Sequence, residues 1–333
     1  MTDSDNQVAL GEFDVIATYF RPLTQDRDEA LSLTDDAGLL TPPTGSQLVV
    51  TTDALVAGRH FLADMDPASL GHKVLGVNLS DLAAMGATPQ AYTLALAAPK
   101  PLSGEWLAAF TVGLGEAQAA GNVFLLGGDT VGTTGPLTLS ITALGWVADG
   151  RALCRSGAAP GHDLYVSGTV GDAALGLLIA RDDADLTGNA EMNRYLKDRF
   201  ERPQPRVFLG PALVGCAHSC VDISDGLVAD IGHIAETSGV GAQINAQDLP
   251  LSDAAQTALD QAPDLLEGIL TGGDDYELAF TAPVSARDEI TVAAKSSAVP
   301  VTRIGSMIER PGVHVIGPGG ASLDLSIDGF RHF

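Results

Sequence analysis

Residues 48–87, LVVTTDALVAGRHFLADMDPASLGHKVLGVNLSDLAAMGA, are the stretch around which the rest of the chain is organised. The apolar run 48–50 is typical of a β-strand, and it stops at the polar residues 51–53, Thr-Thr-Asp. A second apolar run, VLGV, leads to Asp81 and to a helix-like DLAAMG, and His60 lies between the two runs. Functional groups are commonly presented to a ligand where a buried segment ends. We therefore expect this stretch to bind Mg²⁺ and the phosphates of a nucleotide.

Asp residues recur after Gly, Ser or Thr at the ends of apolar runs along the whole chain. A single Asp of this kind is more often a turn or capping residue, and Ser80 and Ser224 are predicted N-caps with an Asp in the first turn. The recurrence favours a metal site, because Mg²⁺ takes oxygen ligands and bound cations relieve the repulsion between clustered carboxylates. The candidate oxygen ligands are Asp36, Thr51, Thr52, Asp53, Asp81, Asp129, Asp222 and Asp225.

The length and composition are those of a globular protein with a sizeable core. The chain has 333 residues, of which 45% are hydrophobic. The regular apolar segments are interrupted near residue 150 by a loop-like stretch that contains Gly and Arg. We therefore expect two domains, residues 1–150 and 151–333. The acidic, polar start predicts that there is no signal peptide, and the longest uncharged stretch is too interrupted by Gly, Pro and Thr for a membrane-spanning helix.

Charge and cysteine content restrict the partners and the compartment. The net charge is −24, which argues against binding to a nucleic-acid backbone, since that requires clustered Lys and Arg. The three cysteines lack the spacing of a disulfide framework, which favours a reducing cytoplasm. Cys216 and Cys220, with His218 between them, could instead form a metal site, but an isolated pair is more often a buried apolar turn.

Two pairs of short motifs recur in the same order and at nearly the same spacing. The first half carries VNLSD and then LLGGD, and the second half carries VDISD and then LTGGD. This pattern indicates that the halves repeat one α/β unit and present related acidic loops. Coincidence between short motifs is the alternative, and superposition of the two halves would decide between them.

Known phosphate-binding motifs are absent from the chain. It has no GxxxxGK[ST] and no kinase-type Gly-rich loop with a following strand Lys. If the chain handles nucleotide phosphates, it must use Mg²⁺, the N–H groups of Gly-rich turns and a few arginines. Arg155 could hold a phosphate bidentately or could be a surface residue at a domain junction. His60 could orient an acceptor or could be an ordinary loop histidine.

Taken together, the motifs resemble those of the thiamine-monophosphate kinase family, within the aminoimidazole-ribotide synthetase-like ATP-binding superfamily. The resemblance covers nearly the whole chain, and TTDALVAGRHF with NLSDLAAMGA is its most specific part. The other matching segments are GEFDVIATYF, DDAGLL, LLGGDT, RALCRSGAAPGHDLYVSGTVGDAALGL, RPQPRV, DISDGLVADIGHI, LTGGDDYELAFT and GFRHF.

The resemblance implies a mixed α/β fold of two domains, an N-terminal sheet domain that dimerises and a C-terminal α/β domain that completes the ATP and substrate site. It implies ATP-dependent phosphorylation of thiamine monophosphate to thiamine diphosphate, several Mg²⁺ ions at the nucleotide, and a homodimer. The candidate metal ligands are those given above. The implied ATP contacts are Gly128, Asp129, Arg155 and Ser224. The implied contacts to thiamine monophosphate are His60, Asp274 and Phe330, and the family usually has Glu at the position of Asp274.

No catalytic acid or base is expected, because a phosphate monoester's second pKa is about 6 and the attacking oxygen is already ionised. Two other functions stay open on the sequence. A related enzyme of the same superfamily would use ATP on another acceptor, and GRHF and GFRHF argue against it. A nucleotide- or Mg²⁺-sensing module would bind ATP without turnover.

Overall fold

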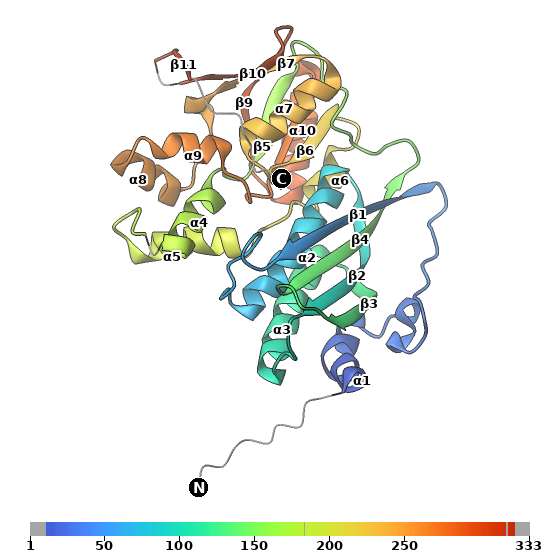
Figure 1. Cartoon of the computed structure of the whole chain (residues 1–333). Coiled ribbons are helices and arrows are strands. Elements are labelled where there is room, and N and C mark those ends of the chain that lie inside the picture. The colour runs from blue at the N-terminus through green and yellow to red at the C-terminus, as the bar shows by residue number, and fades with distance from the viewer. Residues whose placement is uncertain (1–10, 183, 318, 324–333) are drawn as a thin grey trace. The chain divides into compact units, whose positions relative to one another are not determined.

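The computed structural model describes residues 11–182, 184–317 and 319–323, which divide into two compact units (Figure 1). The first unit comprises residues 11–41, 52–75 and 90–143. The second comprises residues 42–51, 76–89 and the described residues from 144 onward. Phe330 lies outside the described residues. The predicted boundary near residue 150 stays a prediction.

The N-terminal part of the chain carries short helical segments and then a four-stranded sheet. The segments are α1 (Glu12–Val15), a π-helical turn η1 (Ile16–Phe20), and the 3₁₀ turns η2 (Arg21–Thr24) and η3 (Asp28–Leu33). They are followed by β1 (Ser46–Val56), α2 (Pro67–Ala84), β2 (Thr88–Ala98), α3 (Gly104–Gly121), β3 (Phe124–Gly132) and β4 (Thr138–Ala148). The strand order is β1-β4-β2-β3, and β2 and β3 are parallel.

The helix α2 corrects the prediction that Asp81 follows the end of an apolar segment. The run VLGV is not a separate segment: it lies inside α2, and Asp81 belongs to the last turn of that helix. Ser80 is likewise interior and fully buried, so it is not an N-cap. Apolar side chains on almost every side of α2 are buried, which hides the helical period from a sequence reading.

The strand β3 corrects a second prediction, that the segment LLGGD ends in a turn at its glycines. Gly127 and Gly128 are paired within the strand, opposite Thr93 and Leu94 of β2. A Cβ on Gly128 would lie 2.1 Å from the Leu94 carbonyl oxygen, so glycine is needed there for the close approach of two strands. A glycine required by strand packing looks the same in sequence as a glycine required by a turn.

The second unit contains a seven-stranded sheet of order β11-β10-β7-β9-β5-β8-β6. Its strands are β5 (Asp163–Ser167), β6 (Ser219–Asp222), β7 (Gly241–Asn245), β8 (Leu278–Ala282), β9 (Val301–Ile308), β10 (Gly312–Ile316) and β11 (Ser322–Leu323). The pair β7–β10 is parallel and the other neighbouring pairs are antiparallel.

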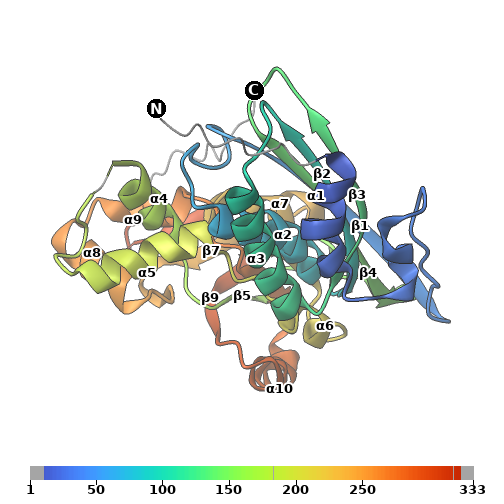
Figure 2. The same ribbon diagram turned by 90° about the horizontal axis from the view of Figure 1, so that it is seen from below.

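Both faces of this sheet are covered, because the side chains of its central strands alternate between two cores. Leu164 and Val166 of β5 pack in the core under α7 (Leu227–Ser238), whereas Tyr165 packs with the small helix α6 (Leu209–Leu213) and α10 (Arg287–Ser297). Figure 2 shows α7 and α10 on opposite sides of β5 and β9. Helix α7 ends at Ser238, and Gly239 caps it in the left-handed conformation.

A group of four helices completes the second unit. These are α4 (Asp172–Asp182), α5 (Ala190–Glu201), α8 (Asp253–Gln261) and α9 (Leu265–Thr271), which bury one apolar cluster and lie together in Figure 2. The remaining short turns are η4 (Ala246–Asp248) and η5 (Val284–Ala286). None of the helices in the described part of the chain combines the length and apolar character needed to cross a membrane.

The two pairs of motifs that suggested an internal repeat have different structures. VNLSD lies within helix α2, whereas VDISD leaves strand β6 for a loop. LLGGD lies within strand β3, whereas the glycines of LTGGD follow the end of helix α9. The prediction of related acidic loops in the two halves is therefore wrong, and the short motifs match by coincidence.

Candidate active site

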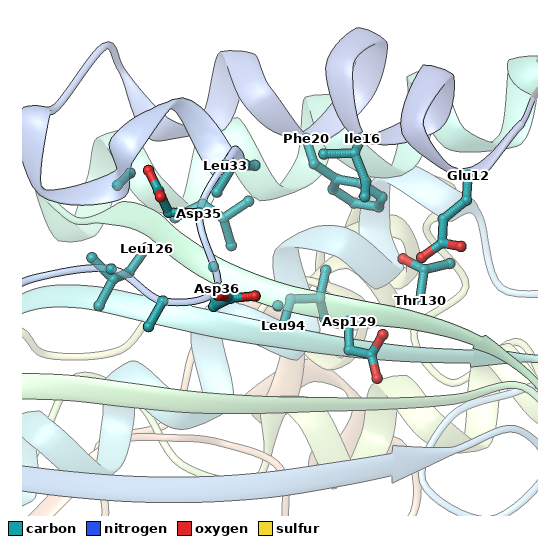
Figure 3. A pocket seen from close by; sticks show the side chains of 16 residues that line it. Glu12, Ile16, Phe20, Leu33, Asp35, Asp36, Leu94, Leu126, Asp129 and Thr130 are labelled. Carbon is teal, nitrogen blue, oxygen red and sulfur yellow. The ribbon is translucent and has the colours of Figure 1, made fainter.

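In the first unit, a cavity of about 210 Å³ is lined by the N-terminal helical segments, the stretch 35–38 and strand β3. Asp36 and Asp129 both line it, and Gly128 supplies part of its wall. Figure 3 shows Ile16 and Phe20 projecting from the helical segments toward the strands that carry Leu94 and Asp129. Glu12 and Asp35 also line the cavity, which thus combines an apolar wall with four carboxylates, a combination suited to a nucleotide with a bound cation.

The remaining candidates in the first unit are Thr52, Asp53 and His60. The Thr52 hydroxyl donates a hydrogen bond to the Ile141 carbonyl at 2.9 Å, and Asp53 follows it in β1. The Nδ1 atom of His60 accepts a hydrogen bond from the Val56 N–H at 3.1 Å. In the neutral ring this places the proton on Nε2, which is a donor that an anionic group can accept from.

In the second unit, Thr51 and Asp81 contact each other directly. The Thr51 hydroxyl donates to Asp81 Oδ2 in a short hydrogen bond. Burial raises the pKa of the Asp81 carboxyl, while the Thr51 hydrogen bond and the positive charge of Arg155 act in the opposite direction. The carboxylate also lies in the last turn of α2, where the helix dipole disfavours negative charge.

A half-buried carboxylate at the negative end of a helix is a costly arrangement that a bound cation would relieve. The groups that meet here, a hydroxyl and a carboxylate, are oxygen ligands of the kind that Mg²⁺ takes. The residues present therefore fit the predicted ion.

The loop after β6 carries three more candidates, Asp222, Ser224 and Asp225. Asp222 is the last, buried residue of its strand. Ser224 is not the predicted N-cap, because α7 starts after Gly226. The N–H groups of residues 224–226 instead donate to the carboxylate of Asp230, a residue that the sequence reading missed. Its only signal in the sequence is an acid in the first turn of a predicted helix.

Asp274 lies next to the same loop. Its N–H donates to the Ser224 carbonyl at 2.9 Å, and the Tyr276 hydroxyl donates to Asp274 Oδ1 at 3.1 Å. Asp274 and Tyr276 both have positive φ, at 69° and 51°. Such backbone conformations are unfavourable for side-chain-bearing residues, and they persist where the surrounding structure fixes them, often at functional sites.

Buried ion pairs and hydrogen bonds hold the two acids that follow Asp274 in the same segment, Asp275 and Glu277. Glu277 is fully buried and accepts hydrogen bonds from Arg199 at 3.0 Å, from Arg206 Nε at 2.6 Å and from the Ser167 hydroxyl at 2.6 Å. Asp275 is also buried and accepts from the N–H groups of residues 171 and 173, at the start of α4. The sequence reading missed both acids, because a buried ion pair leaves no periodic signal.

Two domain families match successive parts of the chain. Residues 34–147 match the N-terminal domain of AIR synthase related proteins, and residues 159–317 match the C-terminal domain. The fold and the acidic loops thus define an AIR synthase related protein.

Thiamine-monophosphate kinase of Escherichia coli K12 is 44% identical over 328 residues, which cover 98% of this chain and 99% of that protein. The enzyme of the same name from Salmonella typhimurium is 42% identical over 330 residues, covering 98% and 99%. The chain belongs to the thiamine-monophosphate kinase family.

Solved structures show the same relationship. The crystal structure of thiamine-monophosphate kinase from Stenotrophomonas maltophilia K279a has a TM-score of 0.83 and 44% identity, covering 94% of this chain and 98% of that one. AaThiL complexed with AMPPCP and TMP has a TM-score of 0.77 and 28% identity over the whole of both chains. The predicted mixed α/β fold of this family is confirmed.

Proposed function

We propose that this protein transfers the γ-phosphoryl group of ATP to thiamine monophosphate and forms thiamine diphosphate. Membership of the family supports this reaction, and the structure of AaThiL in complex with AMPPCP and TMP supports the two substrates. The observation that carries the metal-dependent form of the reaction is the half-buried Asp81–Thr51 contact, where burial raises the pKa of a carboxyl whose charged form a bound cation would stabilise.

In this proposal residues 1–150 form a domain that binds Mg²⁺ and ATP and dimerises, and residues 151–333 complete the ATP and substrate site. Several Mg²⁺ ions bind per site, and the proposed ligands are Asp36, Thr51, Thr52, Asp53, Asp81, Asp129, Asp222 and Asp225. The proposed ATP contacts are Gly128, Asp129, Arg155 and Ser224. The proposed contacts to thiamine monophosphate are His60, Asp274 and Phe330.

The chain's own groups have separate tasks. The apolar wall of the cavity beside Gly128 and Asp129 suits an aromatic base and excludes water from it. The Arg155 guanidinium offers paired N–H donors to phosphate oxygens. His60 Nε2 offers a single N–H donor to the acceptor phosphate, and Tyr276 holds the shorter Asp274 side chain at a fixed orientation.

No side chain needs to remove a proton, because the attacking phosphate oxygen is ionised near neutral pH. The barrier is then the approach of two anions, and Mg²⁺ supplies charge neutralisation when it is bound. Transfer is proposed to be direct and in line. The residues named above bind, orient and shield the reactants, which is most of what such a transfer requires of a protein.

Incubation with ATP, Mg²⁺ and thiamine monophosphate tests this function. We expect ADP and thiamine diphosphate in equal amounts, and no ADP above background when the acceptor is omitted. Release of inorganic phosphate without thiamine diphosphate would indicate a phosphatase, and tight ATP binding without turnover would indicate a sensing module. Either result contradicts the proposal.

The protein is further proposed to be a homodimer of the reducing cytoplasm. Strand β1 lies at the edge of its sheet, and its Leu48 and Val50 side chains are 47% and 55% exposed. Exposed apolar side chains on an edge strand are typical of an interface. The three cysteines are unpaired thiols, in keeping with a reducing compartment. Light scattering should give twice the mass of the chain, and Leu48→Asp should reduce it to that of a monomer.

A further inference from the structure

The loop between β6 and α7 directs three consecutive N–H groups at a single oxygen atom. The amides of Ser224, Asp225 and Gly226 donate to Asp230 Oδ2 at 3.0, 3.0 and 3.1 Å. Asp230 lies in the first turn of α7 and is 1% exposed. Three converging amides form a concave anion-binding nest at a helix N-terminus, and here a side chain of the same chain fills it.

The path of this loop is fixed from its other side by backbone contacts. Gly226 has φ of 125°, and a Cβ there would lie 2.4 Å from the Thr271 carbonyl oxygen. A Cβ on Gly273 would lie 2.0 Å from the Ser224 carbonyl oxygen. The loop is therefore held between the backbone of residues 271–274 and the Asp230 carboxylate. Loss of the carboxylate would release the N–H groups of residues 224–226 but would leave the contacts with residues 271–274 in place.

The occupied nest decides what the loop can offer to a nucleotide. Its amides already have an acceptor, so they are not available to phosphate oxygens. What remains is the hydroxyl of Ser224 and the carboxylate of Asp225, both assigned above to Mg²⁺ and ATP. We propose that Asp230 is a positioning residue: it fills the amide nest and thereby sets the direction of the Ser224 and Asp225 side chains toward the metal-bound nucleotide. This inference rests on the proposed function.

A direct role for Asp230 as a metal ligand is the competing explanation. Asp225, Asp230 and His233 each place one possible ligand atom within 4.8 Å of the others. The two roles differ in what they require of residue 230. Holding three amides needs an oxygen acceptor, which Asn also provides, whereas coordinating Mg²⁺ at this position favours a charged carboxylate.

The test compares Asp230→Asn with Asp230→Ala by calorimetric binding of ATP in the presence of Mg²⁺ and without acceptor. Positioning predicts that Asn stays within about 3-fold of the wild-type Kd and that Ala weakens it by about 10- to 100-fold, the usual cost of losing a group that orients metal ligands. Hydrogen exchange of the peptide covering residues 220–230 supplies a readout independent of binding. It should accelerate in the Ala variant and stay near wild type in the Asn variant.

Ser103→Ala is the matched control, because Ser103 caps α3 by accepting from the Trp106 N–H and its loss costs about 1 kcal/mol without touching this loop. It should leave ATP binding unchanged. Unchanged affinity in the Ala variant would overturn the proposal, as would an Asn variant as weak as Ala.

If the Ala variant does not fold, the Asn variant decides: near-normal affinity with near-normal exchange supports positioning, and a 10-fold loss overturns it. A wild-type protein that binds ATP with Mg²⁺ but forms no thiamine diphosphate would refute the proposed function while leaving this inference intact.

Discussion

Glu277→Gln should destabilise the protein strongly, because Glu277 is the acceptor that the buried Arg199 and the half-buried Arg206 share. The side chain is fully buried, Arg199 is 3% exposed, and both arginines and the Ser167 hydroxyl donate to its carboxylate. Gln keeps the shape but removes the charge, and its NH₂ group faces donors instead of accepting from them. Removing one partner of a buried ion pair typically costs about 3–5 kcal/mol, since the other charge is left buried without compensation.

That loss corresponds to a fall in Tm of about 10 °C, at about 2–4 °C per kcal/mol for a cooperative unit of this size. Thermal unfolding followed by circular dichroism, in the absence of ligands, would measure it. Arg181→Gln is the matched control, because Arg181 and Asp182 form an ion pair with side chains 57% and 52% exposed. Exposed pairs contribute little, so this variant should unfold near the wild-type Tm.

The same substitution should raise the KM for thiamine monophosphate. The Glu277 carbonyl accepts from the Ile223 N–H at 2.8 Å, and the preceding residues carry Asp274. Weaker contacts at residue 277 would therefore allow Asp274, the proposed contact to thiamine monophosphate, to move. A Glu277→Gln variant with a Tm within about 2 °C of wild type would contradict this expectation, because it would mean that Asp172, 3.8 Å from Arg199, compensates the buried guanidinium without Glu277.

Three further predictions follow from individual groups. Burial raises the pKa of Asp275 from 3.8 to about 7. A folded pKa above the unfolded value means that the folded state retains a proton that the unfolded state releases, so stability should fall as the pH rises from 4 through 7. Urea unfolding at pH 5 and 8 should show this fall, and Asp275→Asn should flatten it; an equally steep profile in the variant would assign the effect to another group. Asp81→Asn should lower kcat at least about 100-fold while leaving Tm without Mg²⁺ unchanged or higher, because burial raises the pKa of this carboxyl and the neutral amide avoids the cost. Near-normal turnover at saturating Mg²⁺ would remove Asp81 from the proposed ligands. Gly128→Ala should cost about 1–3 kcal/mol because its Cβ would meet the Leu94 carbonyl, whereas Gly127→Ala, with open space around its Cβ, should be tolerated. Equal stability of the two alanine variants in denaturant unfolding would contradict the strand contact.

Much of the fold could be predicted from local patterns, and the errors have physical causes. The polar and apolar residues of strand β4 alternate, which is the pattern of a half-buried strand and can be recognised in the sequence. Helix α2 was read wrongly because it is buried on almost every side and has no polar face to reveal its period.

The candidate site was predictable in composition but not in arrangement. The acids that belong to recurring motifs could be proposed from the sequence, because their residue type and neighbours are visible there. Asp230 was missed, since its role depends on three amides that converge only after α7 has formed. Glu277 and its arginines were missed for a similar reason: the residues that pair with it are far away in the chain.

In the proposed reaction, phosphate passes directly from ATP to thiamine monophosphate. A single-turnover reaction with ATP labelled in the γ-phosphate, quenched at successive times, measures it most directly. The label should leave ATP and enter thiamine diphosphate at the rate at which ADP forms, with none attached to the protein at any time. Label in inorganic phosphate, or on the protein before it reaches the product, would contradict the account.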